Sequence, residues 1–347
     1  MRHTHSVLDT PAQEIGCRRG WIVGASYVCA LCCAVPVMLS TGCGGAARNA
    51  QRLAARQHNT PVERVVPLGS GISLQLVLVP AGSFAMGSDD RKLGPDCQPN
   101  WPSNRITLTK PFYIGKYEVT QAQWRQVMGK SPTARQAGRS GLGRRVDGDT
   151  SRCPVGSVTW EECLEFARRL TALTQNRMVF RLPTEAEWEY ACRAGSRAFY
   201  CFGNSERKLR KYAWFRENSD AALHPVGHLK PNAWGIHDMH GNSAEYCSDW
   251  LGYYRPSPRT DPIGDKDSAE YRAVRGGCFL SYPISCRSSS RKRSMCILAG
   301  SALAKKRGYA AESGRSPVIG LRIAATLPDG VGLQRTRDGE DDQKPEK

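Results

Sequence analysis

The sequence predicts an α+β fold that is irregular and rich in loops, and three observations lead to this prediction. Three segments begin with the same helix-capping pattern, and several short stretches have the alternating or continuous apolar character of β-strands. The chain also contains 34 Gly and 21 Pro against only 8% aromatic residues, a balance typical of many turns. Its 347 residues, 40% of them hydrophobic, are enough for one large domain or two ordinary ones.

Short strands are predicted in the first third of the chain. Residues 74–80 form a continuous apolar run that we interpret as a buried strand, and residues 81–88 as a glycine-punctuated hairpin. Residues 105–109 alternate between polar and apolar, as a half-buried strand does, and residues 112–117 are another short strand.

Three helices are predicted from capping boxes. In each, a threonine side chain caps the backbone N–H three residues later, and a Gln or Glu at that position reaches back to the threonine N–H. The second helix carries an apolar stripe that belongs in a core, and the third ends near Gly195. The capping pairs are Thr120–Gln123, Thr159–Glu162 and Thr184–Glu187, and the stripe consists of Trp160, Cys163, Leu164, Ala167 and Leu170.

The N-terminal region indicates export. Residues 21–39 form an uncharged apolar run preceded by Arg18 and Arg19, which orients the run with its N-terminus in the cytoplasm. The run leads to Cys43 in a sequence similar to a bacterial lipoprotein cleavage box, although Ser40 stands where leucine is usual. Lipidation of Cys43, ordinary signal cleavage and an uncleaved anchor are the alternatives. Each places the domain outside the cytoplasm, so we expect a membrane-attached lipoprotein of the cell envelope, facing the periplasm or the cell exterior.

Composition divides the chain into four parts. Residues 1–43 are the signal, lipoprotein or anchor segment, and residues 44–73 are expected to be a tether. Residues 74–326 are the folded domain, and residues 327–347 a disordered polar tail.

Cysteine usage agrees with export. Nine of the 14 cysteines follow Cys43, and in an oxidising compartment some of them are expected to form disulfides. The pairing stays open, and an odd number leaves at least one cysteine without a partner among the nine. No zinc-finger spacing occurs among them, so a zinc site is not expected.

Basic residues are concentrated in one stretch. The net charge is +17, and residues 272–311 contain nine Lys or Arg and no Asp or Glu. Such a stretch either binds a polyanion, anionic lipid or acidic protein, or is a solvated face with a flexible insertion. We favour the solvated face, because no nucleic-acid fold signature accompanies the charge, and we expect no nucleic-acid partner.

Phrases in a fixed order identify a family. The strongest reads Arg-Leu-Pro-Thr-Glu-Ala-Glu-Trp-Glu-Tyr-Ala over residues 181–191. Together the phrases resemble the formylglycine-generating-enzyme, or sulfatase-modifying-factor, domain. This resemblance implies an irregular, loop-rich single domain with the C-type-lectin-like superfold. The phrases lie at residues 79–88, 118–120, 154–160, 181–191, 212–215, 218–219, 224–227, 231–235, 238–242, 275–277 and 320–322.

The resemblance also implies a reaction, but one of the two cysteines that it requires is missing here. Enzymes of the family oxidise a sulfatase cysteine to formylglycine with oxygen and copper held by two cysteines. Cys286 falls at the second copper cysteine, but Ser281 falls at the first, and a hydroxyl does not replace a thiolate toward Cu(I). Cys278 stands where the family has an active-site serine. Cys286 and Cys278 are therefore the catalytic candidates, and we favour a structural role for Cys286.

A second segment of the resemblance implies calcium. The ligands would be the Asp238 and Glu245 side chains and the carbonyl groups of Gly241 and Ser243, and oxygen-only ligands suit Ca²⁺. The alternative is that the two carboxylates cap turns or pair with arginines. In the same segment Ala244 replaces a tryptophan that would line the substrate groove.

These departures lead to one expectation and one alternative. We expect an exported domain that no longer makes formylglycine and instead binds a protein or peptide partner. The alternative is a copper-dependent oxidoreductase that converts a protein cysteine to formylglycine, with Cys286 and a non-standard partner such as Cys278.

Overall fold

The structure is a computed structural model that describes most of the chain after the predicted export segment. The described residues are 43–92, 97–98, 100, 102–132, 139–140, 144–145, 149–253, 257–264, 270–294 and 315–326, and all belong to one compact unit. Within these ranges no helix is long and apolar enough to cross a membrane. The apolar run of residues 21–39, the side chain of Cys43 and the predicted tail lie outside the described part.

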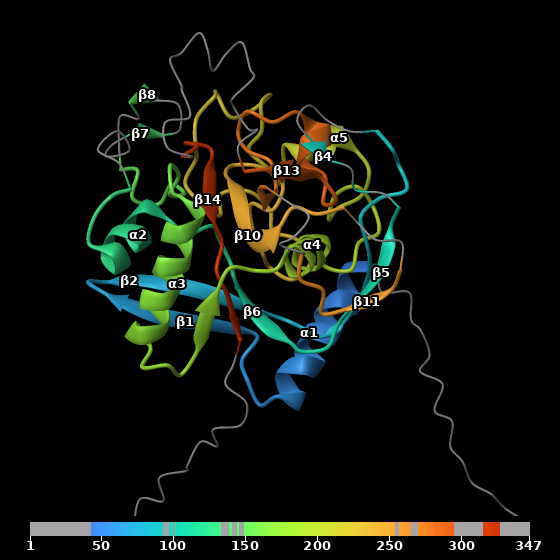
Figure 1. Cartoon of the computed structure of the whole chain (residues 1–347), viewed down its shortest axis with the longest axis horizontal. Helices are drawn as coiled ribbons and strands as arrows, with labels where there is room; N and C mark the ends of the chain where they lie inside the picture. Colours follow the sequence, from blue (N-terminus) through green and yellow to red (C-terminus); the bar gives the residue numbers. More distant parts are fainter. Residues whose placement is uncertain are drawn as a thin grey trace, which may run out of the picture. The chain divides into compact units, whose positions relative to one another are not determined.

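A five-stranded antiparallel sheet of order β1-β2-β6-β15-β9 runs through the lower half of Figure 1. The predicted first strand, half-buried strand and short fourth strand correspond to β2, β5 and β6. The predicted hairpin of residues 81–88 is wrong, because this segment holds a single strand, β3, which pairs with β5. The strands of this sheet are β1 (Glu63–Gly69), β2 (Ile72–Val79), β6 (Phe112–Gly115), β9 (Val179–Arg181) and β15 (Ala324–Thr326).

A second five-stranded sheet, of order β14-β10-β12-β13-β4, carries the candidate site. Its β10 and β14 are parallel and lie side by side in Figure 1, and its other neighbours are antiparallel. Its strands are β4 (Cys97–Gln98), β10 (Ala244–Trp250), β12 (Arg272–Arg275), β13 (Arg291–Arg293) and β14 (Ile319–Leu321).

Smaller sheets complete the strands of the described part. β11, β5 and β3 form a three-stranded sheet. β7 and β8, of two residues each, form an antiparallel pair. Their bounds are β3 (Gly82–Met86), β5 (Asn104–Leu108), β7 (Arg139–Ser140), β8 (Arg144–Arg145) and β11 (Arg259–Thr260).

Helices pack on the first sheet, and the side chains of β2 contribute alternately to two large hydrophobic cores. Leu74, Leu76 and Leu78 belong to one core with residues of α2 and α3, whereas Val77 and Val79 belong to a second core with residues of α4. This alternation is the period of two that a strand buried on both faces requires. The helices are α1 (Cys43–Gln57), α2 (Gln121–Met128), α3 (Trp160–Leu173), α4 (Glu185–Arg193), α5 (Glu206–Leu209) and the 3₁₀ helix η3 (Pro283–Cys286).

The three predicted capping boxes are confirmed, with both reciprocal hydrogen bonds present at α2, α3 and α4. The end of α4 is also as predicted, because Ala194 and Gly195 both adopt positive φ there. The stripe of α3 is partly wrong: Phe166 is buried in the core, whereas Leu164 is 37% exposed.

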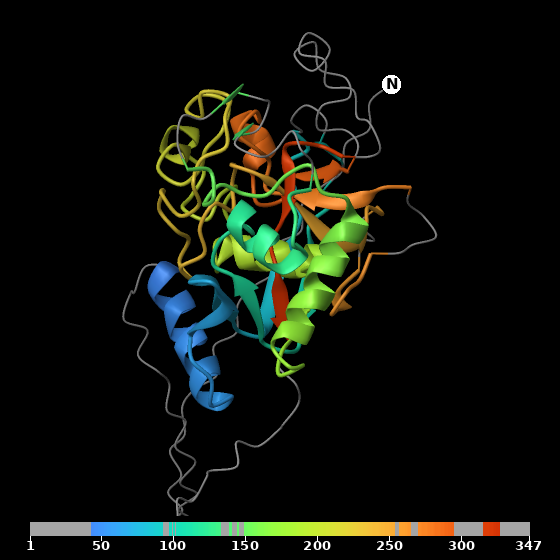
Figure 2. The same ribbon diagram turned by 90° about the vertical axis from the view of Figure 1, so that its left-hand side faces the viewer.

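The expected tether of residues 44–73 differs from the structure, because α1 and β1 are both packed on the domain. Figure 2 shows α1 (blue) against β1 and β2. Gln51 Nε2 donates to the Leu78 and Trp234 carbonyls at 2.8 and 3.3 Å, and Trp234 Nε1 donates to the Ala47 carbonyl at 3.0 Å. The buried positions of α1 are small or polar, so the helix has no large apolar stripe that the sequence would reveal.

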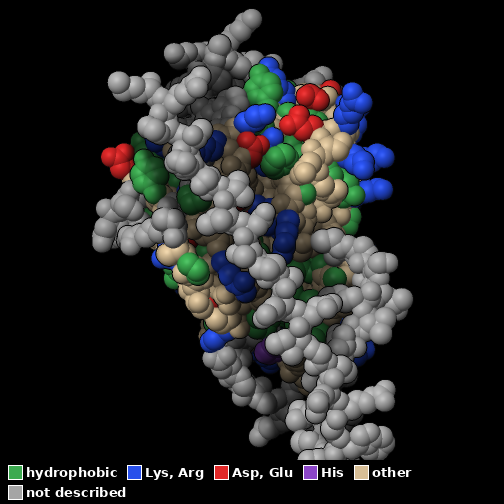
Figure 3. Space-filling view, turned by 90° about the vertical axis from the view of Figure 1, so that its right-hand side faces the viewer, with side chains coloured by type: hydrophobic (Ala, Val, Ile, Leu, Met, Phe, Trp, Pro, Cys, Tyr) green, Lys and Arg blue, Asp and Glu red, His purple; other side chains and the backbone are tan. Residues whose placement is uncertain are grey.

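The solvated face expected for the basic stretch is wrong for its described residues. The Arg272 guanidinium lies 3.4 and 3.6 Å from the ring centroids of Trp160 and Trp250, and Arg275 and Arg291 are buried in ion pairs. On the face shown in Figure 3, basic side chains (blue) are scattered, with acidic ones (red) among them near the top.

Candidate functional site

The candidate site is built around a glycine turn that follows β12. Gly276 and Gly277 have φ angles of 91° and 74°, a region that favours glycine. A Cβ on Gly277 would lie 3.0 Å from Cys286 Sγ and 3.3 Å from Ser281 Oγ. The hydroxyl and the thiol that the resemblance singles out therefore face the same point, and only a glycine leaves room between them.

Ser281 closes a tight turn with Cys278. The Ser281 N–H donates to the Cys278 carbonyl at 2.8 Å, and the Cys278 N–H donates to Ser281 Oγ at 2.9 Å. Lys292 Nζ lies 3.4 Å from the same oxygen, and Cys278 Sγ lies 3.5 Å from it. The Ser281 oxygen is thus engaged by a backbone donor and by a buried ammonium group.

Cys286 is a buried thiol at the end of η3. It packs with the rings of Tyr200 and Phe215, and burial raises the pKa of its thiol far above the ordinary value. His240 fixes its backbone: burial lowers the pKa of His240 to about 4, so the ring is neutral. Nε2 of His240 accepts the Cys201 N–H at 3.1 Å, which leaves Nδ1–H to donate to the Cys286 carbonyl at 2.9 Å.

These residues do not fit a Cu(I) site. Cu(I) prefers two deprotonated sulfurs, whereas the structure offers one protonated, buried thiol and one hydroxyl that already accepts two hydrogen bonds. The described cysteines, Cys278 and Cys286 among them, are all free thiols, so the expected disulfides do not occur between described residues.

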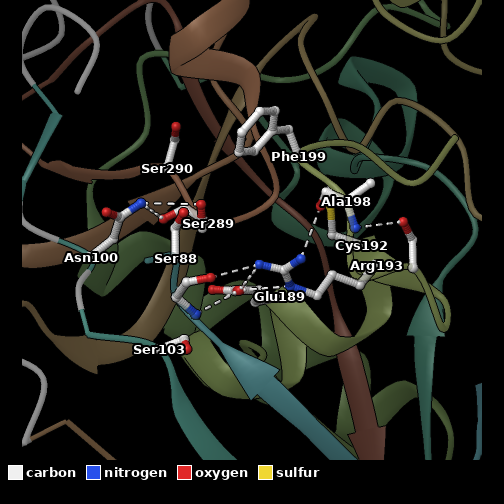
Figure 4. Close-up of polar contacts among 12 residues, drawn as sticks. Ser88, Asn100, Ser103, Glu189, Cys192, Arg193, Ala198, Phe199, Ser289 and Ser290 are labelled. Atoms are coloured by element: carbon white, nitrogen blue, oxygen red, sulfur yellow. Dashed lines mark hydrogen bonds and ion pairs between the residues drawn. The ribbon is translucent and has the colours of Figure 1, made fainter. Parts of the chain in front are cut away.

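An ion network behind the turn holds it in place. Glu189 accepts the Gly87 N–H at 2.9 Å and Arg193 Nε at 2.8 Å, and it also pairs with Arg275 immediately before the two glycines. Figure 4 shows Glu189 and Arg193 facing each other. All three charged side chains are buried. The carboxylate therefore ties α4, β12 and the loop after β3 together.

The predicted calcium segment forms a second buried network. Both Glu245 oxygens are occupied, by Arg322 at 2.8–3.1 Å and by Trp188 Nε1 at 2.7 Å. Asp238 Oδ2 accepts the Gly227 N–H at 2.7 Å, and its Oδ1 has no hydrogen-bond partner among the described residues. Glu118 accepts the Ser243 N–H at 2.8 Å. Burial, together with the charges of Asp238 and Glu245, raises the pKa of Glu118 well above its ordinary value.

This arrangement does not fit a calcium cage. The Glu245 carboxylate is already neutralised by a guanidinium, and only one oxygen of Asp238 is free. Among the residues that the structure describes, no three His, Cys, Asp or Glu side chains gather as metal ligands. The pairing of a carboxylate with an arginine, which was the alternative, is what Glu245 adopts.

Ala244 does not line a groove. It is wholly buried in the first core, as is Tyr246 two residues later, and it pairs with Ile319 of β14. The expected change in a ligand groove at this position is therefore wrong, and the alanine is a core residue.

Several residues of these networks were not anticipated, and three of them contact the predicted site residues from outside their segments. Lys292 faces Ser281 from the neighbouring strand, and Arg322 and Glu118 flank the predicted calcium segment. Arg322 and Glu118 lie inside the family phrases, which was a usable signal. Lys292 lies in a run of basic residues that indicated only surface charge.

Comparisons with known proteins agree with this fold and with the family phrases in the sequence. The sequence pattern described as "Sulfatase-modifying factor enzyme 1-like domain" matches residues 72–302. Chaperone protein LppX of Paenibacillus barcinonensis is 30% identical over 258 residues, covering 60% of this chain and 80% of that protein. The formylglycine-generating enzyme of Bos taurus is 25% identical over 325 residues, covering 77% and 84%.

Two solved structures share the fold. Treponema denticola variable protein 1 matches with a TM-score of 0.62 and 26% identity, covering 76% of this chain and 99% of that one. PvdO from Pseudomonas aeruginosa matches with a TM-score of 0.59 and 29% identity, covering 76% and 98%. The fold is the α+β, C-type-lectin-like one that the sequence predicted. Because the family pattern spans well over half of the sequence, this chain belongs to the sulfatase-modifying factor enzyme 1-like, or formylglycine-generating-enzyme, domain family.

Proposed function

We propose that this protein is an exported, membrane-attached member of its family that does not make formylglycine and instead binds a protein or peptide partner. The observation that carries the proposal is Ser281. Its oxygen stands at the position of the first copper cysteine, where it caps the Cys278 N–H and faces Lys292. A hydroxyl so engaged is a poor ligand for Cu(I).

The face beside Ser281 has the character of a binding surface. Tyr282 is 44% exposed, and the Arg216 guanidinium lies 4.7 Å from its ring centroid. The Arg216 N–H donates to the Ser281 carbonyl at 3.0 Å, which links this surface to the site. Tyrosine and arginine are the side chains that dominate protein interfaces. A relative named as a chaperone, a class of protein that acts by binding, also favours this role.

The decisive experiment is a turnover assay with a matched gain-of-cysteine variant. The full chain in detergent is incubated with Cu(I), oxygen and a Cys-x-Pro-x-Arg peptide, and formylglycine is detected by mass spectrometry. We expect no product from the natural chain. Ser281→Cys restores the second thiol and is expected to raise Cu(I) binding measured by competition with a chromogenic chelator.

The copper-dependent oxidoreductase remains the alternative, and one contact favours it. Cys278 Sγ lies 3.5 Å from Ser281 Oγ, close to the point that Cys286 Sγ also faces. Product formation by the natural chain that is lost in both Cys286→Ala and Cys278→Ser would establish this alternative and overturn the binding proposal.

Membrane attachment has its own test. The proposal rests on the apolar run of residues 21–39 and on Cys43 after it. The full chain expressed in a bacterium with labelled palmitate is expected to take up the label and to fractionate with membranes. Cys43→Ser should abolish the label, and an unlabelled natural chain would exclude lipidation.

A further inference from the structure

Lys292 of β13 is a buried cation that no described carboxylate balances. Its side chain is almost fully buried, the residue being 6% exposed, and among the described residues it has one hydrogen bond, the 3.4 Å contact with Ser281 Oγ. The other deeply buried cations of the described part each pair with a carboxylate. These pairs are Arg193–Glu189, Arg275–Glu189, Arg291–Glu185 and Arg322–Glu245.

The strand register explains why Lys292 is different. Neighbouring residues of a strand point to opposite faces of the sheet, so Arg291 reaches Glu185 on one face and Lys292 points to the other. Lys292 pairs in register with Val274 of β12 and with Cys97 of β4. Its lateral neighbours are therefore an aliphatic side chain and a thiol, and neither supplies a negative charge.

We propose that Lys292 and Ser281 form an anion-binding subsite that receives one carboxylate of the ligand. An unpaired buried ammonium is costly, and a negative charge brought by a ligand removes that cost. The Ser281 hydroxyl adds a second donor, since its oxygen accepts the Cys278 N–H while its own hydrogen can turn toward the ligand. This inference rests on the proposed binding role of the same face.

The number of charges and donors selects a carboxylate over a phosphate. The subsite offers one ammonium and one hydroxyl, surrounded by the thiols of Cys278 and Cys286. A phosphate carries about two negative charges and three acceptor oxygens at neutral pH, and in protein sites it is bound by several charged donors. A carboxylate carries one charge and is matched by one ammonium.

Ser281 is nearly buried while Tyr282 beside it is exposed, so the subsite lies directly beneath the surface. An acidic side chain or chain terminus of a peptide has the required chemistry.

The test compares two alkylating reagents that differ only in charge. Iodoacetate carries a carboxylate and iodoacetamide is its neutral isostere. In both reactions a cysteine thiol loses its proton to solvent, its sulfur bonds to the CH₂ carbon, and iodide leaves. Peptide mapping of the full chain gives the rate at Cys278 and Cys286 for each reagent. We expect the iodoacetate-to-iodoacetamide rate ratio at the faster of the two to fall about tenfold in Lys292→Met, as loss of a charge-assisted hydrogen bond predicts.

Lys211→Met is the matched control, because Lys211 is exposed and its loss changes the net charge equally. Its ratio should equal that of the natural chain. A ratio that is the same in all three proteins would overturn the proposal.

If both thiols are too buried to react, a second measurement tests whether the subsite binds a carboxylate. The melting temperature is followed against propionate and propionamide at constant ionic strength. A saturable rise with propionate alone, absent in Lys292→Met and kept in Lys211→Met, supports the subsite, whereas equal curves refute it. Neither measurement uses copper or turnover, so the subsite and the loss of formylglycine chemistry fail or stand separately.

Discussion

Asp238→Asn is expected to make the protein more stable at neutral pH. Asp238 is buried, and Oδ2 accepts the Gly227 N–H while Oδ1 has no partner. Asparagine keeps an acceptor for that N–H and replaces the unpartnered oxygen with an amide. It also tolerates the left-handed backbone, since φ is 59° at this position. The substitution therefore removes a buried negative charge, and with it the repulsion that raises the pKa of Glu118.

The expected magnitude follows from the acidity of Asp238. Burial raises the pKa of its carboxyl from 3.8 to about 6. The folded protein then holds a proton that the unfolded chain has released, so this stability is fully present below about pH 4 and is lost as the pH rises through about 6. A difference of about two pKa units corresponds to about 3 kcal/mol. Asp238→Asn should recover up to that amount at pH 7.5 and almost nothing at pH 4.

Urea unfolding of the natural chain and of Asp238→Asn at pH 4 and pH 7.5 measures this effect. The difference in unfolding free energy should grow with pH. A variant that is less stable at pH 7.5, or a difference that is equal at both pH values, would refute the reasoning. Repeating the pH 7.5 series with millimolar Ca²⁺ tests the calcium expectation. Stabilisation of the natural chain that is absent from the variant would show that Asp238 takes part in a cation site after all.

Three further substitutions test the packing. Gly277→Ala should cost about 1–3 kcal/mol more than Gly71→Ala in urea unfolding, because both glycines have φ 74° but only the Gly277 Cβ meets Cys286 Sγ; equal costs would contradict the site geometry. Arg272→Ala should cost about 1–2 kcal/mol and shift tryptophan fluorescence, because the guanidinium lies between two indole rings; an unchanged spectrum would argue against that stacking. Gln51→Leu should cost about 1–3 kcal/mol by leaving two carbonyls unsatisfied, and unaltered hydrogen exchange in α1 would mean that the helix is not held there.

Local signals in the sequence were sufficient to predict where α2, α3 and α4 begin. Thr159 and Glu162 close their capping box with atoms only three residues apart, so the pattern needs no knowledge of the fold. Apolar or alternating runs predicted β2, β5 and β6 for the same reason, whereas residues 81–88 form one strand, β3, that pairs with the later strand β5. The helix α1 had no such signal, since Ala47 and Gln51 are held by contacts with residues far along the chain. A helix docked through small and polar side chains is indistinguishable in sequence from a polar linker.

The basic stretch could not be interpreted from the sequence because its partners are distant. Arg275 pairs with Glu189, 86 residues away, and Arg291 pairs with Glu185, 106 residues away. Composition counts nine positive charges but cannot count the negative ones that the fold brings to them. The family phrases located the site, whereas the proposed anion subsite depends on Lys292, which only the register of β13 against β12 places beside Ser281.

The serine at position 281 is a consistent part of this site. Its oxygen accepts the Cys278 N–H at 2.9 Å, and a thiol sulfur is a much weaker acceptor. The glycine turn before it is held by the ion pair of Glu189 and Arg275, and this pair does not depend on the chemistry of residue 281. A cysteine there would therefore keep the turn but weaken its closing hydrogen bond and lose the oxygen that faces Lys292. The hydroxyl suits a site that closes a tight turn and receives an anion, and a thiolate suits one that holds a metal cation. A buried ammonium beside the second kind of site would repel the metal, so Lys292 is compatible with a hydroxyl at position 281 and disfavours bound Cu(I) there.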